Sequence, residues 1–455
     1  MNNTARCQAM HIGIVAWSLF ISRGGIQQAA VDLAHAMLER GHDVTVFYRK
    51  SSKNHAAPLY HLNHRIPLVG FYVEAYNAFV SPHETASMLN SMRESILSSG
   101  VDVLAAMFSW DALLLFPTVM RDTGVPLIIS EHNNPHVINE ERWNVYERHA
   151  CLAAADCIHV LTPAYKAALP EFLQKRTRVI PNPAHRLLPK EQNPQTGEKI
   201  ILAAGRFVDH HKMFSLLIES FAALEAQFPD WRLVLCGDGP DRKKYERLIQ
   251  KLGIAGKTTI PGMVSDMSPY YKKCAFVCVP SRYEGFPLIP LEAYSYTKPV
   301  VGFSTCSGLN EIIIHGETGL LAPEFTAYSL TGQLALMMND AELRIRFGQT
   351  GWDSLSRFAA EEVYSLWERL FEEAITAKGN TRLQRLSVLQ TEEENVTMAL
   401  YEILSRSSPF IPFNIRTLRE LNIRVQDKKV PSNTIATKLF VFFNTMRRYA
   451  RSFIK

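Results

Sequence analysis

The chain has 455 residues, more than one hydrophobic core ordinarily supports, so we expect two or three domains. No run of eighteen apolar residues is present, which excludes a membrane-spanning helix and predicts a soluble globular protein. The net charge is +5, and the excess of positive charge lies after residue 378, where there are thirteen Lys or Arg and six Asp or Glu. The rest of the chain is slightly acidic, which disfavours a nucleic-acid-binding protein.

The segment before His11 is polar and lacks the long apolar stretch of a signal peptide. Seven cysteines are scattered along the chain, an odd number that favours reduced thiols over a disulfide framework. No Cys-x-x-Cys pair suggests zinc. We therefore expect a cytoplasmic protein.

The chain begins with a β-α-β pattern: a strand at His11–Ala16, a helix at Ile26–Arg40 and a strand at Asp43–Tyr48. The dinucleotide fingerprint G-x-G-x-x-G is absent. Gly24 and Gly25 precede the helix, where glycine lets the backbone approach a ligand. Such a pair is equally often a plain turn.

A polar segment, Ser130–Pro135, follows one of the next predicted strands. Open α/β sheets bind ligands at this edge, so His132 could meet a substrate hydroxyl. It could equally hydrogen-bond its own loop, and position alone favours neither. The remaining strands of this half are expected at Val101–Met107, Pro126–Ser130, Cys157–Leu161 and Arg178–Ile180. The histidines without a comparable setting are interpreted as structural: His11, His35, His42, His149 and His159.

After a polar linker, Ala184–Glu198, a second α/β series starts with the strand Lys199–Ala204. Arg206 follows this strand, and Lys212 precedes the helix Met213–Gln227. A guanidinium fork and a mobile ammonium group suit a diphosphate. Isolated cations in a turn are usually solvated, but their place after a strand favours the diphosphate.

Three later strands are each followed by a turn that could contact a ligand. The strand Trp231–Cys236 precedes a turn at Gly237. The strand Thr258–Ile260 precedes Met263 and Val264, which could pack against a nucleobase or form an ordinary loop. Ser307–Glu311 opens a helix after the strand Pro299–Gly302 and offers further amides.

The stretch Ser281–Ala293 organises this half, because it joins two apolar strands through a turn and a helix. Pro287 suits the first helical position, and the free N–H groups of the turn suit a phosphate. Glu284 and Glu292 bracket it, and carboxylates accept hydrogen bonds from sugar hydroxyls. A molecule with phosphates in the middle and hydroxyls at both ends is a nucleotide sugar.

Together these motifs resemble the large retaining glycosyltransferase family 4 from His11 to Lys378. Its motifs are matched by Gly24-Gly25, Gly205-Arg206 with Lys212, Gly237-Asp238-Gly239, Glu284-x7-Glu292, Ser307–Glu311 and Gly316–Leu321. The phrase Leu127–Asn133 is similar to bacterial members that add hexoses or N-acetylhexosamines to lipid-linked glycans.

The resemblance implies an α/β, GT-B architecture, with two Rossmann-like, doubly wound parallel-sheet domains facing a cleft. Residues 1–187 would form the acceptor-side domain, completed by a crossing helix at 358–378. Residues 188–357 would bind the nucleotide sugar, and 379–455 would form a basic, helical C-terminal extension.

The resemblance also implies roles for single residues. Arg206 and Lys212 would neutralise the diphosphate leaving group, and Glu292 would bind the ribose. Glu284 would bind the transferred sugar, and His132 matches a first-domain histidine near the reacting sugar. The remaining donor-binding residues would be Gly24, Gly25, Gly205, Gly237, Met263, Val264, Gly285, Phe286, Pro287 and Leu288. The family implies no metal cofactor, and the chain has no Asp-x-Asp motif.

Two positions depart from the family pattern. Met213 stands where the family often has glycine, and Pro287 with Pro290 replaces a glycine and an aliphatic residue. These departures bear on how the turn contacts the phosphate and on the choice of donor.

Near the end of the chain, apolar residues recur at alternating spacings of four and three, and basic residues lie between them. Such a helix could lie on an anionic membrane surface or pack on protein, and both interpretations stay open. The apolar positions are Ile435, Leu439, Phe442, Met446, Tyr449 and Phe453.

The motifs together with the resemblance therefore imply a retaining hexosyltransferase that uses a UDP-hexose or UDP-N-acetylhexosamine. Its acceptor would be a lipid-linked surface-polysaccharide or lipopolysaccharide precursor at the inner face of the plasma membrane. The alternative is a catalytically silent nucleotide-sugar-binding assembly partner. A phosphorylase-like or epimerase relative would need a different set of site residues.

Overall fold

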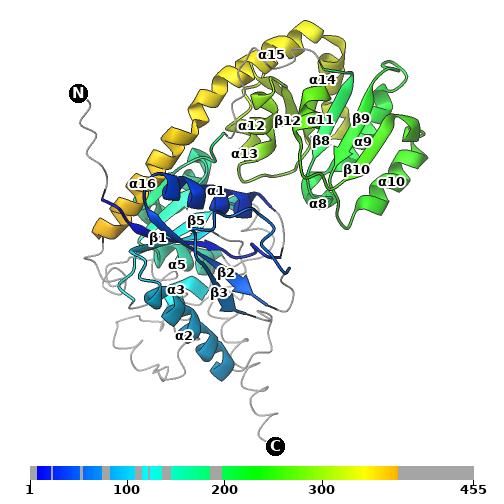
Figure 1. The fold of residues 1–455 in the computed structure, drawn as a ribbon. Coiled ribbons are helices and arrows are strands. Elements are labelled where there is room, and N and C mark those ends of the chain that lie inside the picture. Colours follow the sequence, from blue (N-terminus) through cyan, green and yellow to red (C-terminus); the bar gives the residue numbers. More distant parts are fainter. Residues whose placement is uncertain are drawn as a thin grey trace, which may run out of the picture. The chain divides into compact units, whose positions relative to one another are not determined.

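The computed structural model describes residues 8–377 except 22–23, 52–54, 74–81, 108–114, 121–122, 136–144 and 185–196. It contains two parallel β-sheets with helices on both faces of each, so the predicted α/β class with two doubly wound domains is confirmed (Figure 1). The predicted junction at 187–188 and the extension at 379–455 lie outside the described residues.

The first sheet has seven strands in the order β3-β2-β1-β4-β5-β6-β7, and every neighbouring pair is parallel. Its central strand, β4, is apolar throughout and fully buried, as expected for a strand covered on both faces. The strands are β1 His11–Ala16, β2 Asp43–Lys50, β3 Leu68–Tyr72, β4 Val103–Met107, β5 Leu127–Glu131, β6 Cys157–Val160 and β7 Thr177–Val179.

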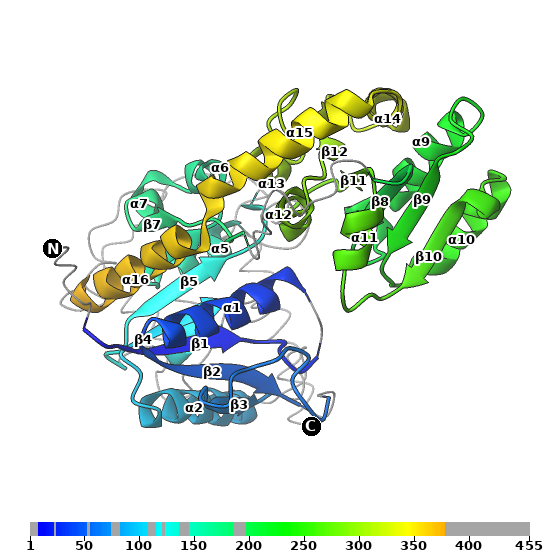
Figure 2. The same ribbon diagram turned by 45° about the horizontal axis from the view of Figure 1, so that its top comes forward.

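Helix α1 (Gly25–Glu39) covers one face of this sheet, and α2 (Pro82–Ser98) covers the other (Figure 2). Further helices on the α2 side are α3 Leu115–Val119, α5 Val145–Ala153, α6 Pro163–Ala167 and α7 Glu171–Gln174.

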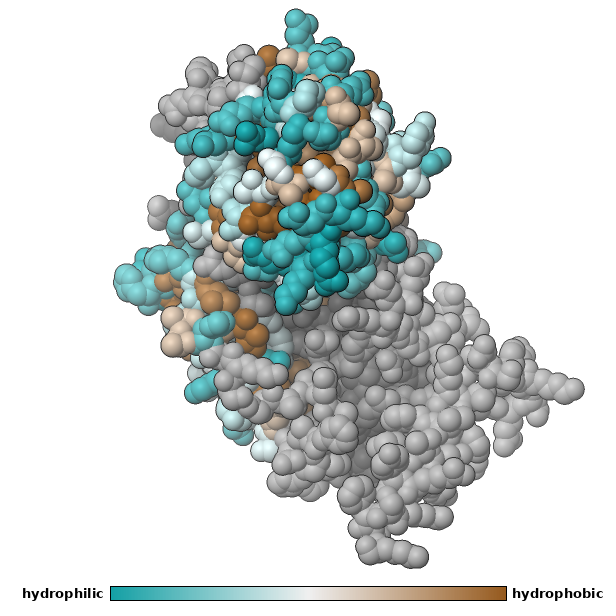
Figure 3. Space-filling model, turned by 90° about the vertical axis from the view of Figure 1, so that its right-hand side faces the viewer, coloured by the Kyte–Doolittle hydropathy of each residue, from teal (hydrophilic) through white to brown (hydrophobic). Residues whose placement is uncertain are grey.

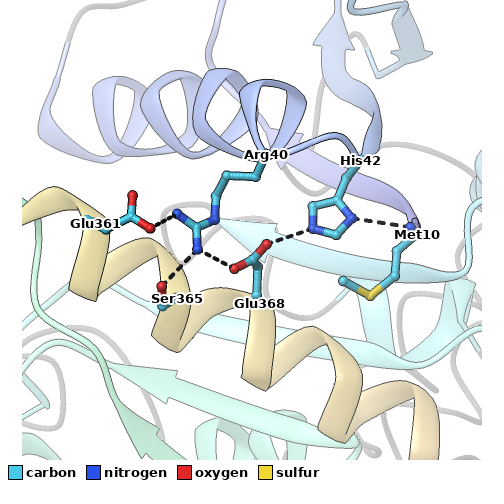
Figure 4. Close-up of polar contacts among 6 residues, drawn as sticks. All are labelled: Met10, Arg40, His42, Glu361, Ser365 and Glu368. Carbon is cyan, nitrogen blue, oxygen red and sulfur yellow. Dashed lines mark hydrogen bonds and ion pairs between the residues drawn. The ribbon is translucent and has the colours of Figure 1, made fainter. Parts of the chain in front are cut away.

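The last described helix, α16 (Ala360–Thr376), follows the second sheet in the chain but packs on the first sheet beside α1. Its Trp367 and Phe371 are buried in the core that α1 covers. At the end of α1, the Arg40 guanidinium donates hydrogen bonds to Glu368, Ser365 and Glu361 (Figure 4).

His42, which immediately precedes β2, completes this contact. His42 Nδ1 accepts a hydrogen bond from the backbone N–H of Met10 at 3.2 Å, so its Nε2 carries the hydrogen. That Nε2–H donates to Glu368 Oε1 at 3.0 Å, as Figure 4 shows. Glu368 thus ties α16 to two segments of the first domain.

The second sheet has six parallel strands in the order β10-β9-β8-β11-β12-β13. They are β8 Ile200–Ala204, β9 Arg232–Cys236, β10 Thr258–Gly262, β11 Phe276–Val279, β12 Val300–Phe303 and β13 Gly319–Ala322. One face is covered by α9 Phe214–Leu224, α10 Arg242–Lys251 and α14 Ala327–Asn339, and the other by α11 Ser268–Lys273, α12 Leu288–Ser295 and α13 Ser307–Asn310. The remaining helices are α8 Asp209–Lys212, the 3₁₀ turns η3 Ala255–Lys257 and η4 Leu355–Phe358, and α15 Ala341–Ser354.

In each sheet the strand order reverses beside its first strand, between β1 and β4 and between β8 and β11. Ligands of open α/β sheets bind at the carboxyl ends of the strands that flank such a point. In the second sheet these ends lead into Gly205–Lys212 and Ser281–Glu284. The predicted diphosphate cations and sugar-binding carboxylate therefore follow the two strands that flank the reversal.

The outer face of α10 is strongly polar, because only Tyr245 and Ile249 of its sequence RKKYERLIQK are buried. The coloured, described residues in Figure 3 are accordingly mostly hydrophilic, with apolar groups between them. Among the described helices, none is long and apolar enough to cross a membrane.

Candidate active site

The turn after β8 holds the predicted phosphate-binding residues. Gly205 follows the strand, Arg206 is exposed to solvent, and Lys212 is the last residue of the short helix α8. Met213 then adopts φ 51° and ψ 36°, the left-handed region, between α8 and α9. This geometry favours glycine, which is the residue expected at this position from the resemblance, and methionine adopts it here.

Close backbone contact at the end of β9 fixes the position of this turn. Gly237 has φ 149°, and a Cβ on it would lie 1.9 Å from the carbonyl oxygen of Gly205. The Gly205 N–H also donates to Cys236 O at 3.0 Å. Only glycine fits at position 237, because any side chain would collide with the Arg206 turn. Gly237 therefore has a structural role here, independent of any contact with a ligand.

The two segments that flank the strand reversal meet in an ion pair. Lys212 Nζ donates to Glu284 Oε1 at 2.5 Å, and Ser281 Oγ donates to the same oxygen at 2.6 Å. Burial opposes ionisation of Glu284, but the charge of Lys212 and these hydrogen bonds outweigh it and lower its pKa. The site therefore contains an ionised carboxylate that a half-buried ammonium group holds in place.

His211 links the same two turns, although nothing in the sequence singles it out. Its ring stacks on Tyr283 with centroids 4.5 Å apart and planes 16° apart. Its Nε2 donates to Tyr283 O at 2.8 Å, and its own carbonyl accepts from the Arg282 N–H at 2.9 Å. Burial lowers the pKa of His211, so the ring links the turns without adding charge.

Glu292 lies half-buried on α12 and accepts a hydrogen bond from the Tyr271 hydroxyl at 2.6 Å. Tyr271 is itself buried and stacks on Tyr296, with ring centroids 5.5 Å apart. The prediction that Pro287 opens this helix is off by one residue, since Pro287 is its N-cap and α12 begins at Leu288. Proline suits either position, because neither needs its N–H.

The other predicted donor-binding residues differ in how exposed their side chains are to a ligand. Met263 is 65% exposed, whereas Val264 packs against the core. The Phe286 side chain is buried, with its ring 5.4 Å from that of Phe358, so only its backbone can reach a ligand. Leu288 is half-buried at the start of α12.

Gly24 and Gly25 lie at the start of α1, where Gly24 is the N-cap and Gly25 is the first helical residue, one position earlier than the predicted start at Ile26, and both are exposed. The Gly24 N–H donates to the Tyr60 hydroxyl at 2.6 Å. Its φ of −178° is ordinary extended backbone, and a Cβ on Gly25 would meet nothing within 4 Å. Close approach of a ligand remains the reason proposed for glycine at these two positions.

His132, after β5 of the first sheet, lies beside the Glu284 turn. A Cβ on Gly285 would lie 1.9 Å from the carbonyl oxygen of His132, so the two backbones touch. Two first-domain side chains missed in the sequence also hold this turn. Tyr165 donates to Glu284 O at 2.5 Å, and Asn182 donates to Phe286 O at 3.1 Å.

His132 is buried and its Nε2 lies 2.9 Å from the Ser130 hydroxyl. His132 therefore hydrogen-bonds within its own segment, as one of the two interpretations expected. It also borders the sugar site that the other interpretation proposes. Among the described residues, no group of His, Cys, Asp and Glu could hold a metal ion.

Both halves of the chain match models of known protein families. Residues 23–185 match the family described as Glycosyltransferase Family 4, and residues 185–353 match Glycosyl transferases group 1. The chain belongs to the family 4 glycosyltransferases. Both domains that surround the Lys212–Glu284 pair thus belong to a family of transferase enzymes.

Two bacterial relatives align with this chain over nearly the whole of their own length. An uncharacterized glycosyltransferase of Haemophilus influenzae is 24% identical over 76% of this chain and 96% of its own. A Campylobacter jejuni α-1,4-N-acetyl-D-galactosaminyltransferase, named for an undecaprenol-linked acceptor, is 24% identical over 78% of this chain and 97% of its own.

Solved structures share the fold of this glycosyltransferase. HepE of Anabaena, in complex with UDP and glucose, aligns with a TM-score of 0.63 at 18% identity, over 80% of this chain and 99% of its own. The lipopolysaccharide outer core galactosyltransferase WaaB aligns with a TM-score of 0.61 at 19% identity, over 81% and 100%. The predicted GT-B architecture and enzyme class are confirmed.

Proposed function

We propose that this glycosyltransferase moves a hexose or N-acetylhexosamine from a UDP-sugar to a glycan, with retention of the anomeric configuration. The observation that carries the proposal is the Lys212–Glu284 ion pair at 2.5 Å, with Ser281, where the strand order of the second sheet reverses. It joins a cation suited to phosphate and a carboxylate suited to sugar hydroxyls.

Charge explains the proposed chemistry. When the anomeric C–O bond breaks, negative charge develops on the diphosphate and positive charge on the sugar ring. Arg206 and Lys212 would stabilise the diphosphate, and preorganised groups of this kind are usually the largest catalytic contribution. Glu284 would hold the transferred sugar, and Glu292, oriented by Tyr271, would hold the ribose. The departing phosphate oxygen would accept the proton of the acceptor, so the reaction needs neither a protein nucleophile nor a metal.

We further propose a lipid-linked precursor of a surface polysaccharide or lipopolysaccharide as the acceptor, at the cytoplasmic face of the plasma membrane. The Campylobacter relative is named for an undecaprenol-linked acceptor, and WaaB for the lipopolysaccharide outer core.

A transfer assay tests the proposal. The full chain is incubated with a panel of UDP-sugars and lipid-linked acceptors, with and without EDTA, and the products are analysed by mass. We expect one donor to give a product one sugar heavier, in the same yield with EDTA. Transfer from no member of the panel would refute the UDP-sugar proposal, and loss of the product in EDTA would refute metal independence.

Two substitutions identify the site. Arg206→Ala and Glu292→Ala should each lower the rate of transfer by about 10²–10³. Arg206 is exposed, so its variant should keep the wild-type melting temperature. Arg247→Ala, which removes an exposed arginine of α10, is the matched control and should keep full activity. Full turnover by either site variant would remove that residue from the mechanism.

A further inference from the structure

Three side chains of the first domain form a continuous series of hydrogen bonds that ends at His132. His159, on β6, lies between a backbone carbonyl and Ser130, on β5. Its Nε2 is 2.7 Å from Ile180 O, and its Nδ1 is 2.7 Å from Ser130 Oγ. Ser130 Oγ is in turn 2.9 Å from His132 Nε2. The sequence favours a purely structural role for His159, but the structure connects it to the proposed site through Ser130.

The carbonyl end fixes the direction of every bond in the series. A carbonyl oxygen only accepts, so His159 Nε2 carries a hydrogen. With the ring neutral, His159 Nδ1 is an acceptor and the Ser130 hydroxyl must donate to it. The Ser130 oxygen can then only accept from His132, whose Nε2 must carry its hydrogen.

Burial keeps both rings neutral. His159 is 1% exposed, and burial lowers its pKa to about 4. Burial, and secondarily the neighbouring His159, lowers the pKa of His132 to about 3. Trp367 of α16 covers the series, with its ring 4.5 Å from that of His159, so the crossing helix contributes to excluding water.

We propose that Ser130 and His159 are positioning residues that hold His132 as the neutral Nε2–H tautomer, so that Nδ1 accepts a hydrogen bond from a hydroxyl of the reacting sugars. The inference rests on the function proposed above, in which His132 borders the sugar bound by Glu284. A neutral acceptor beside the sugar ring favours the positive charge that develops there, whereas an imidazolium would oppose it.

A spectroscopic experiment tests the tautomer without any activity. The full chain is labelled with ¹⁵N-histidine, and long-range ¹⁵N–¹H spectra distinguish Nε2–H from Nδ1–H rings. The His132→Gln variant identifies the His132 signals. We expect a neutral Nε2–H ring at pH 7 in the wild type. An Nδ1–H or doubly protonated His132 overturns the proposal, whether or not a donor has been found.

Kinetics then test the function with matched substitutions. Ser130→Ala and His159→Leu interrupt the series and should lower kcat about tenfold, equivalent to about 1.4 kcal/mol, with the donor KM changed less than twofold. Ser130→Thr keeps the hydroxyl, and His159→Asn keeps an acceptor near the position of Nδ1, so both should recover most of kcat.

The controls are Ser220→Ala and His149→Leu, which remove a buried serine and a buried histidine outside the series. They should keep wild-type kcat even where they lower the melting temperature. Wild-type kcat in both Ser130→Ala and His159→Leu, or no recovery in both Ser130→Thr and His159→Asn, would overturn the proposal. An inactive wild type with an Nε2–H His132 would instead refute the proposed donor and leave the tautomer assignment standing.

Discussion

Lys212 and Glu284 each carry a charge that burial would make costly without the other. Their side chains are 17% and 10% exposed. A buried carboxylate that loses its partner retains the cost of its own desolvation, so removing one member of such a pair costs more than the pair contributes. The same two residues therefore bear on stability and on the proposed chemistry, and the two effects can be separated.

Lys212→Met should lower the free energy of unfolding by about 3 kcal/mol, because Glu284 is left unpaired. The rate of transfer should fall by about 10²–10³, because a cation aimed at the leaving group is lost. Denaturant unfolding and the transfer assay measure the two effects.

The double variant Lys212→Met/Glu284→Gln is the control, since it removes both charges. It should recover stability to within about 1 kcal/mol of the wild type but remain inactive. Since the folded-state pKa of Glu284 is lowered, its stabilising effect is complete above about pH 4.5 and is lost as pH falls further. A single variant as stable as the wild type at neutral pH would contradict this account.

Met213 gives a second prediction at the scale of one residue. A side chain other than glycine costs about 1–2 kcal/mol in the left-handed region, most for β-branched residues. Because methionine already carries this cost, Met213→Val should lower the free energy of unfolding further only through its β-branch, by about 1 kcal/mol. Met213→Gly should stay within about 1 kcal/mol of the wild type, because relieved strain and lost chain entropy oppose each other. Thermal unfolding would contradict the assignment if valine were the more stable.

At the scale of the element, α16 depends on polar contacts as well as on its apolar stripe. Arg40 and Glu368 are 20% and 16% exposed, and their contact joins the C-terminal end of α1 to the middle of α16, far apart in sequence (Figure 4). Burial alone would raise the pKa of Glu368, but the hydrogen bonds from Arg40 and His42 outweigh it and lower that pKa.

Arg40→Met should lower the free energy of unfolding by about 2 kcal/mol near neutral pH, as expected for hydrogen bonds between charged groups. The lowered pKa of Glu368 means that this difference is complete above about pH 4.5 and shrinks as pH falls below it. Glu361→Gln is the control, because Glu361 is 79% exposed and should change stability by less than about 0.5 kcal/mol. Equal losses in the two variants would contradict the proposed role of Glu368.

At the scale of the whole molecule, both sheets contribute to one site through contacts between residues distant in sequence. Tyr165 and Glu284, for example, are 119 residues apart. The chain's basic amphipathic pattern, by contrast, lies in residues 434–455, outside the described part, and its role is argued from sequence alone.

Ending the chain after Ser432 should move the protein from the membrane fraction of a cell lysate to the soluble fraction, because the apolar stripe and its basic flanks are removed. Leu439→Ser/Phe442→Ser keeps every charge and should have the same effect if the apolar face inserts. An unchanged distribution in the truncated protein would contradict membrane binding and favour packing on protein.

The sequence by itself predicted two α/β series and the places of most strands, because buried parallel strands are short apolar runs between turn residues. It missed α2, which is rich in polar residues, and the half-exposed edge strand β3. It also selected Arg206, Lys212, Glu284 and Glu292, because charged residues after apolar strands stand out locally.

Only the tertiary structure showed how these residues are supported. Ser281, His211, Tyr271 and the Ser130–His159 pair are ordinary polar residues in the sequence. Their importance comes from hydrogen bonds, most of which join segments distant in sequence, and no local pattern records such contacts. The physical reason is that burial and strand periodicity are properties of neighbouring residues, whereas the direction of a hydrogen bond and the charge of a buried ring depend on groups that folding alone brings together.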